Sequence, residues 1–211
     1  MNQLLILGAG GHGKVLAETA EAQGLWQHIA LLDDRHGLLD GTLRWSVLAS
    51  IDQARCFVSE YSHATVAVGD SRRRLEWLDL LVGLGFCIPT LIHPAAWVSP
   101  SASLAEGCVV MANASVQADA SLGRGSIVNT GASVDHDCSI GDGVHVCPGV
   151  SLGGEVIVGH GSWLGIGCSV IQGVHLGSHV TVGAGAAVIS DIEDAMTVVG
   201  VPARDISRGM E

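Results

Sequence analysis

The sequence predicts two fold classes in succession along its 211 residues, an α/β segment with a parallel sheet and then a parallel β-helix. Three observations lead to this prediction. Apolar runs alternate with helix-like stretches as far as residue 92, a glycine-rich loop follows the first apolar run, and an aliphatic residue recurs at every sixth position from Val98 to Val188. The first two are typical of βαβ units and the third is typical of a repeat protein.

The α/β segment is expected to form a small parallel sheet, with a short turn region between its second and third strands. The predicted strands are residues 3–7, 28–33, 65–68 and 86–92, and the predicted helices are residues 12–23 and 71–84. A full dinucleotide-binding fold has roughly twice as many elements. The segment therefore has room for one nucleotide diphosphate rather than for NAD.

A glycine motif, "GAGGHG" at residues 8–13, directly follows the first predicted strand. Glycines at this point allow a tight turn and let phosphate oxygens approach the backbone at the start of the next helix. The residues expected beside the phosphates are Gly8, Gly10, Gly11 and His12. Asp33 and Asp34 end the second strand, where this motif places a carboxylate that contacts the ribose or base. The motif alone also fits an NAD-dependent dehydrogenase, an alternative that nicotinamide fluorescence of bound NADH would test.

The six-residue period runs from Val98 to Val188 without an insertion, and the residue four positions after each of these aliphatics is small or β-branched. Each such hexad can form a short strand and a corner, with the aliphatic side chain inside and Gly, Asn or Asp in the turn. Three hexads make one coil, so residues 18 apart should stack at about 4.8 Å in a helix of about five coils. Cys108, Cys138 and Cys168 lie 30 residues apart, so they are not expected to form a ladder.

Charge and composition argue against several kinds of partner. The chain has 10 Lys+Arg against 21 Asp+Glu, a net charge of −11, which disfavours nucleic acid and anionic membranes. Neither a secretory signal pattern nor an apolar run of about 18 residues is recognised, so a soluble cytoplasmic protein is expected. The six cysteines and ten histidines show no metal-ligand spacing, so free thiols and no metal are expected.

Four stretches, together with the hexads, resemble a known family. They are Gly8 to Val15, Asp33-Asp34, Val68-Gly69-Asp70 with the arginines after it, and Leu91 to Pro94. The sequence resembles the left-handed β-helix (hexapeptide-repeat) sugar acetyltransferases of bacteria, in particular the UDP-4-amino-sugar N-acetyltransferases of the bacillosamine pathway and the sialic acid O-acetyltransferase-like proteins. The resemblance implies a Rossmann-like N-terminal domain, a left-handed β-helix and a homotrimer with sites between subunits.

The resemblance also implies a division of labour along the chain. Residues 1–92 would hold a nucleotide-linked sugar, with Gly69 among the contacts. Residues 93–193 would bind acetyl-CoA and carry the catalytic groups, and residues 194–211 would form a C-terminal tail.

A polar stretch, "VDHD" at residues 134–137, interrupts the apolar and glycine-rich repeat and indicates a site. His136 is suited to act as the base in acetyl transfer, because an imidazole titrates near neutral pH. The resemblance assigns its acidic partner to Asp137, although some relatives carry the longer Glu there. Gly154 lies 18 residues after His136, and its amide would face a thioester carbonyl as the oxyanion donor, a role that the resemblance also gives it.

The remaining expected contacts follow from the resemblance. Asn129 would lie near the acceptor sugar and His145 near the acetyl group. His145 is half a coil from His136, so these two histidines would meet only across a trimer groove. The predicted contacts for acetyl-CoA at later coils are Ile166, Gly167 and Ala184, with Arg204 for its phosphates.

We therefore predict an acetyl-CoA-dependent N-acetyltransferase that acts on the 4-amino group of a UDP-linked 4-amino-4,6-dideoxy-sugar. One alternative is O-acetylation of a sugar hydroxyl, as in the sialic acid-type enzymes. Another is a non-catalytic trimer that binds a nucleotide sugar. Sugar stereochemistry, the choice of UDP over GDP or dTDP, and the glycan that receives the product are left open by the sequence.

Overall fold

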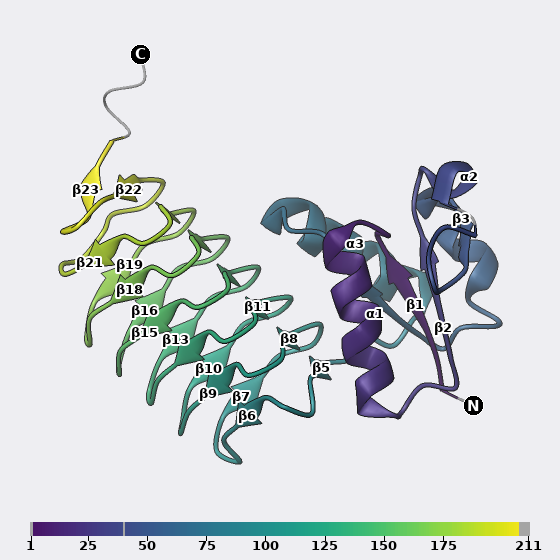
Figure 1. Cartoon of the computed structure of the whole chain (residues 1–211), viewed down its shortest axis with the longest axis horizontal. Coiled ribbons are helices and arrows are strands. Elements are labelled where there is room, and N and C mark those ends of the chain that lie inside the picture. The colour runs from purple at the N-terminus through teal and green to yellow at the C-terminus, as the bar shows by residue number, and fades with distance from the viewer. Residues whose placement is uncertain (1, 40, 207–211) are drawn as a thin grey trace. The chain divides into compact units, whose positions relative to one another are not determined.

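A computed structural model describes residues 2–39 and 41–206 (Figure 1). The chain divides into two compact units after Pro94, and each unit is considered by itself. None of the helices among these residues is long and apolar enough to cross a membrane.

The N-terminal unit is a parallel sheet with helices between its strands. Its elements are β1 (Gln3–Leu7), α1 (Gly11–Gln23), β2 (His28–Leu32), α2 (His36–Leu39), β3 (Val47–Ala49), the 3-10 helix η1 (Ile51–Phe57), β4 (His63–Val66), α3 (Ser71–Leu84) and β5 (Leu91–Ile92). The sheet has the order β3-β2-β1-β4, and all three pairings are parallel. The predicted α/β architecture is thus confirmed.

The core of this sheet follows the period of its strands. Leu5 and Leu7 of β1 share a buried cluster with Leu78 and Leu81 of α3. Leu4 and Ile6 point to the opposite face of the sheet, because successive side chains of a strand alternate. Both are fully buried. Burial on both faces explains why β1 reads as an unbroken apolar run.

Two predictions for this unit are wrong. The turn region between the second and third predicted strands contains the short strand β3, which pairs with β2. The predicted strand 86–92 is not continuous, because only a bridge from Cys87 to His63 and the two residues of β5 are extended. Pro89 lies between them, and a proline has no N–H to donate to a ladder.

The second unit is the predicted left-handed β-helix, and its coils stack in Figure 1 from teal to yellow. Sixteen two-residue strands recur at the six-residue spacing. They are β6 (Trp97–Val98), β7 (Ser103–Leu104), β8 (Val109–Val110), β9 (Ser115–Val116), β10 (Ser121–Leu122), β11 (Ile127–Val128), β12 (Ser133–Val134), β13 (Ser139–Ile140), β14 (His145–Val146), β15 (Ser151–Leu152), β16 (Ile157–Val158), β17 (Trp163–Leu164), β18 (Ser169–Val170), β19 (His175–Leu176), β20 (Thr181–Val182) and β21 (Ala187–Val188).

Every third strand pairs in parallel, so the coils form three sheets. Ser133 of β12, for example, pairs with Ser151 of β15, which confirms the stacking of residues 18 apart. The inward aliphatic residues from Val110 to Val188 are all at most 3% exposed and form the core of the prism. Cys108 lies 3.4 Å from the Oγ of Ser126 one coil later, and all six cysteines are free, so no thiol ladder forms.

The six-residue stride ends before the last two strands, β22 (Thr197–Val199) and β23 (Arg204–Asp205). β22 still pairs in parallel with β20, and β23 pairs with β22 in the antiparallel sense. Part of the predicted C-terminal tail therefore extends one sheet of the β-helix.

Candidate active site

His136 and Asp137 occupy the turn that follows β12. Asp137 has a φ of +58°, in the left-handed region that Asp tolerates better than most residues. This conformation brings its carboxylate to 2.7 Å from the Nδ1 of His136, so the short Asp side chain reaches the ring. A carboxylate only accepts hydrogen bonds, so Nδ1 carries the proton and Nε2 presents its lone pair to solvent.

The electrostatic surroundings of His136 favour its protonated form. The hydrogen bond that His136 donates to Asp137 raises the pKa of the imidazole, and the nearby charges of Asp135, Asp137 and Glu155 act in the same direction. Asp135 also accepts a hydrogen bond from the His136 amide at 2.8 Å, which fixes the backbone of the turn. The result is an exposed imidazole whose pKa lies above its ordinary value.

Gly154 lies directly under this ring, one coil later. A Cβ built at Gly154 would lie 2.5 Å from Cε1 and Nε2 of His136, so only a glycine leaves room for the imidazole. Asp142 occupies the same position in its hexad as Gly154 does. Its amide donates to Nδ1 of His160, which lies 18 residues later, at 3.0 Å. Within the described residues the Gly154 N–H has no such acceptor. An N–H left open beside an imidazole is the arrangement that an oxyanion donor requires.

Asn129 and His145 contact each other on a different corner. The Nδ2 of Asn129 lies 3.1 Å from the Nε2 of His145, and its Oδ1 accepts the Thr130 amide at 2.8 Å. Because the Asn129 amide nitrogen is a donor, Nε2 of His145 accepts and the proton lies on Nδ1. His145 is only 9% exposed, so its ring is buried in the wall of the β-helix.

The residues predicted to contact acetyl-CoA lie on exposed turns. The Gly185 amide donates to the carbonyl of Ile166 at 2.9 Å, which stacks the turn holding Ala184 onto the turn holding Ile166 and Gly167. Ile166 is 59% exposed, so its side chain is accessible to a ligand. Arg204 is exposed on β23 and donates to the Ala203 carbonyl at 2.8 Å. No contact within the chain tests these assignments, which remain predictions.

In the N-terminal unit, a cleft of about 350 Å³ opens at the carboxyl ends of the strands. Its lining residues are Gly8, Gly10, Asp33, Asp34, Arg35, Ile51, Ala67, Val68, Arg73 and Trp77. Gly8 has a φ of +108°, and a Cβ there would lie 2.8 Å from the Ala67 carbonyl oxygen, so this glycine is needed for the turn itself. The Cα atoms of Gly10 and Gly11 face open space, which leaves their backbone accessible.

The other residues predicted around the nucleotide divide into two groups. Asp34 lines the cleft and accepts the Ile51 amide at 3.1 Å. Gly11, His12 and Gly69 are not among the cleft's lining residues. Burial, followed by the charge of Arg74, lowers the pKa of His12 to about 4, so its ring is neutral at pH 7 and offers no charge to a phosphate.

The carboxylate of Asp33 is hydrogen-bonded to groups of the two loops beside it. Its Oδ2 accepts the Ala9 amide at 2.9 Å, and its two oxygens pair with Nε and a terminal nitrogen of Arg35 at 2.9 and 3.0 Å. The hydrogen bond from Arg35 is the main reason that the pKa of Asp33 falls to about 2. Asp33 thus fastens the glycine loop to the end of β2, and Asp34 is the carboxylate left for a ligand.

Comparisons with known proteins show which proteins this chain is similar to. Residues 3–81 match the PglD N-terminal domain. UDP-N-acetylbacillosamine N-acetyltransferase of Bacillus subtilis is 41% identical over 115 residues, so the match spans 53% of this chain and about half the length (52%) of that relative. The acetyltransferase domain of PglB from Neisseria gonorrhoeae, solved with acetyl coenzyme A, is 45% identical with a TM-score of 0.93 over 98% of this chain and 100% of that one. PerB from Caulobacter crescentus, solved with CoA and GDP-perosamine, is 37% identical with a TM-score of 0.91 over 97% of both chains.

The chain belongs to the family of left-handed β-helix sugar N-acetyltransferases. In the sequence of this acetyltransferase, the arginine run Arg72 to Arg74 at the start of α3 predicts a solvated helix face, on which one basic residue could offset diphosphate charge. That expectation holds for Arg72, which is exposed and pairs with Glu76 at 3.9 Å. It is wrong for Arg74, which is 1% exposed and donates to the carbonyls of Val68 and Gly69.

Of the side chains that line the acetyltransferase's cleft, Arg35 and Arg73 were noted in the sequence without a defined contact, and Trp77 was missed. The signal for Trp77 was its spacing from Arg73, because residues four apart on a helix share a face. The Arg73 guanidinium lies 5.8 Å from the centre of the Trp77 ring. Arg35 gave no such signal, since its partner depends on how the loop after β2 turns.

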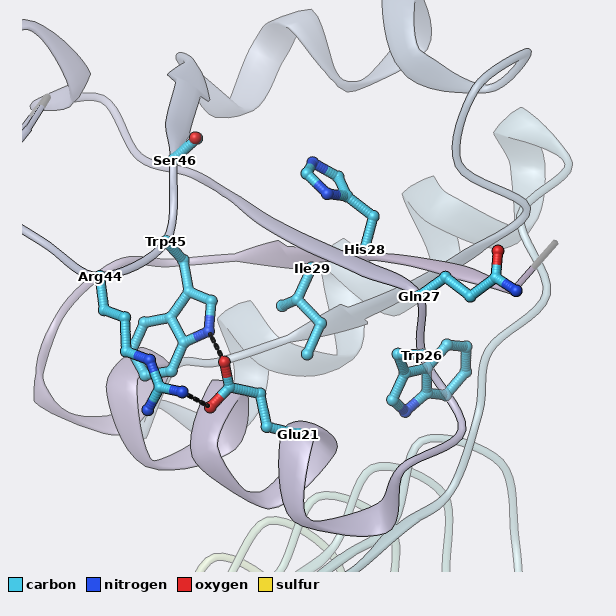
Figure 2. A pocket seen from close by; sticks show the side chains of 8 residues that line it. All are labelled: Glu21, Trp26, Gln27, His28, Ile29, Arg44, Trp45 and Ser46. Atoms are coloured by element: carbon cyan, nitrogen blue, oxygen red, sulfur yellow. Dashed lines mark hydrogen bonds and ion pairs between the residues drawn. The ribbon is translucent and has the colours of Figure 1, made fainter.

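A second cavity of the N-terminal unit, of about 270 Å³, lies at the other end of β2 (Figure 2). Glu21 fixes the positions of two lining residues of this cavity. It accepts a hydrogen bond from the Trp45 indole N–H at 2.8 Å and forms an ion pair with Arg44 at 3.1 Å. None of the residues predicted from the sequence lines this cavity.

Proposed function

We propose that this acetyltransferase moves the acetyl group of acetyl-CoA to the 4-amino group of a nucleotide-linked 4-amino-4,6-dideoxy-sugar, with UDP as the preferred nucleotide. The observation that carries the proposal is the His136–Asp137 pair, with its 2.7 Å hydrogen bond, lying over the open Gly154 amide. A base, a group that orients it and an oxyanion donor are the three functions that acyl transfer to an amine needs.

The reaction follows from these three groups. The amine nitrogen attacks the thioester carbonyl carbon, and Nε2 of His136 takes the proton that the nitrogen loses as the N–C bond forms. Asp137 keeps the proton on Nδ1 and stabilises the resulting imidazolium. The Gly154 N–H donates to the oxyanion, and collapse of the tetrahedral intermediate breaks the C–S bond, with the proton passing from His136 to the sulfur of CoA.

Relatives support both substrates. The Bacillus subtilis relative is named for UDP-N-acetylbacillosamine, the PglB domain was solved with acetyl coenzyme A, and PerB was solved with both CoA and GDP-perosamine. We therefore propose that residues 1–92 hold the nucleotide, that residues 93–193 hold acetyl-CoA, and that residues 194–211 form a C-terminal tail, of which residues 207–211 lie outside the described residues. The product would enter bacterial glycan biosynthesis, and both substrates are metabolites of the cytoplasm, where we place the protein.

We also propose a homotrimer with its active sites between subunits. Several large apolar side chains of the β-helix are at least 38% exposed, among them Trp163, Ile166, Ile171 and Ile189. Subunit packing would remove such apolar side chains from water, so these residues are candidates for the interface. Light scattering coupled to size exclusion should give three chains per particle, and a monomeric mass would contradict the proposal.

The test of the proposed function is thiol release from acetyl-CoA with two acceptors in parallel, a UDP-4-amino-4,6-dideoxy-sugar and its 4-hydroxy counterpart. We expect release with the amino sugar only, because loss of a proton from a sugar alcohol is far less favourable than from an amine that has added to a carbonyl. Release with the hydroxy sugar alone would make the protein an O-acetyltransferase. Repeating the assay with GDP- and dTDP-linked amino sugars identifies the base.

A further inference from the structure

The cleft of the N-terminal unit carries a charge pattern that the glycine motif does not explain. Four of its lining residues are charged: Asp33, Asp34, Arg35 and Arg73. Asp33 and Arg35 neutralise each other through two hydrogen bonds of 2.9 and 3.0 Å. Asp34 and Arg73 are left to meet a ligand.

Arg73 therefore decides whether the cleft accepts a diphosphate. A nucleotide sugar carries two negative charges on its diphosphate, and a cleft whose free charge was Asp34 alone would repel it. With Arg73 present the four side chains sum to zero, and a guanidinium can form two parallel hydrogen bonds to phosphate oxygens.

The backbone around the cleft directs an anion to the same place. α1 begins at the cleft, and its N-cap, Gly10, supplies no side-chain cap to that helix end. α3 begins differently, because the Asp70 carboxylate accepts the Arg73 amide at 2.7 Å and fills that helix end. Phosphate can thus lie at the start of α1, while α3 contributes a side chain.

Trp77 fixes the position of Arg73. The guanidinium lies 5.8 Å from the centre of the indole, one turn further along α3. The indole itself is half-buried and packs against the core of the unit. A guanidinium held over an aromatic face loses less side-chain entropy when it binds a ligand.

We propose that Arg73, positioned by Trp77, binds the diphosphate of the nucleotide sugar and makes the cleft select nucleoside diphosphates over nucleosides. The proposal rests on the proposed function and adds to it the residue that recognises the diphosphate.

The experiment is a calorimetric titration of the full chain with uridine, UMP and UDP, and with GDP in parallel. The variants are Arg73→Gln, Trp77→Leu and Trp77→Phe, with Arg72→Gln as the matched control. Arg72 neighbours Arg73 on α3 but pairs with Glu76 and does not line the cleft. Thermal melts of each variant establish that it is folded.

We expect R73Q to weaken UDP binding about tenfold or more while uridine binding stays the same, because a charged hydrogen bond is lost only with the phosphates. W77L should weaken UDP binding about threefold and W77F should restore it, in line with the strength of a cation–π contact. In the thiol-release assay R73Q should raise KM for the nucleotide sugar and leave kcat unchanged.

Two results would overturn the proposal, and they differ. Equal UDP affinity in R73Q and in the unsubstituted protein would remove Arg73 from the site and leave the proposed function intact. Failure of the unsubstituted protein to bind any nucleoside diphosphate would refute the nucleotide site altogether.

Discussion

Replacing Gly154 with alanine tests the stacking of His136 on the next coil. The backbone of Gly154 lies outside the left-handed region, so alanine fits the local conformation and keeps the N–H. Its Cβ, however, would lie 2.5 Å from Cε1 and Nε2 of His136, against about 3.4 Å for an ordinary contact. The imidazole must therefore retreat by about 0.9 Å, and a misplacement of about 1 Å can lower the rate about a hundredfold.

The assay is thiol release from acetyl-CoA with the amino-sugar acceptor, together with NMR titration of the His136 ring. Gly154→Ala should lower kcat about a hundredfold. It should also lower the pKa of His136 towards its ordinary value, since the ring moves away from Asp137. The matched control is Gly83→Ala on α3, where a Cβ meets nothing within 4 Å. If G154A kept nearly full kcat and an unchanged titration, Gly154 would not support the imidazole.

Three further predictions follow from the contacts. Asp137→Asn replaces the charged acceptor of the Nδ1 hydrogen bond with a neutral amide oxygen, so the pKa of His136 should fall and the ring should become neutral at lower pH. The acidic limb of the kcat/KM–pH profile should move to lower pH, and an unmoved limb would exclude His136 as the base. Asp33→Asn should cost about 2 kcal/mol of stability in urea titrations at pH 7, because the pKa of Asp33 is lowered from 3.8 to about 2. This stabilisation is present above the pKa that Asp33 has in the unfolded chain, and it is lost as pH falls through the pKa of the folded protein. The difference in unfolding free energy between D33N and the unsubstituted protein should therefore shrink from pH 4 towards pH 2. A difference that stays constant over this range would contradict the ion pair. Asn129→Ala should cost about 1 kcal/mol through its lost bond to the buried His145, and an unchanged midpoint would show that the bond contributes nothing.

The β-helix was predictable from the sequence because each coil obeys the same steric rule. The width of the prism limits the size of the side chain at two positions of each hexad, the inward aliphatic residue and the small residue four positions later. The 18-residue coil is by itself enough to predict that Gly154 stacks on His136. The contact of Asp137 with His136 was harder to predict, because it depends on a left-handed backbone conformation at Asp137 that the sequence alone does not indicate.

The N-terminal unit was less predictable because its details depend on tertiary contacts. The strand β3 is three residues long and is extended because it pairs with β2. Arg74 is charged yet buried, because the carbonyls of Val68 and Gly69, in the loop after β4, accept hydrogen bonds from its guanidinium. The engagement of Asp33 by Arg35 likewise arises only when the loop after β2 closes. Pro89, by contrast, was a visible reason to shorten the last predicted strand.

The central claim is that His136 is the base of an acetyl transfer to an amino-sugar nucleotide. The most direct measurement is thiol release from acetyl-CoA by the unsubstituted protein and by His136→Ala, side by side with the same UDP-4-amino-sugar and with acetyl-CoA binding measured for both. We predict release by the unsubstituted protein and a loss of about a hundredfold or more in kcat for H136A, with acetyl-CoA binding retained. Equal rates for the two proteins would contradict the account.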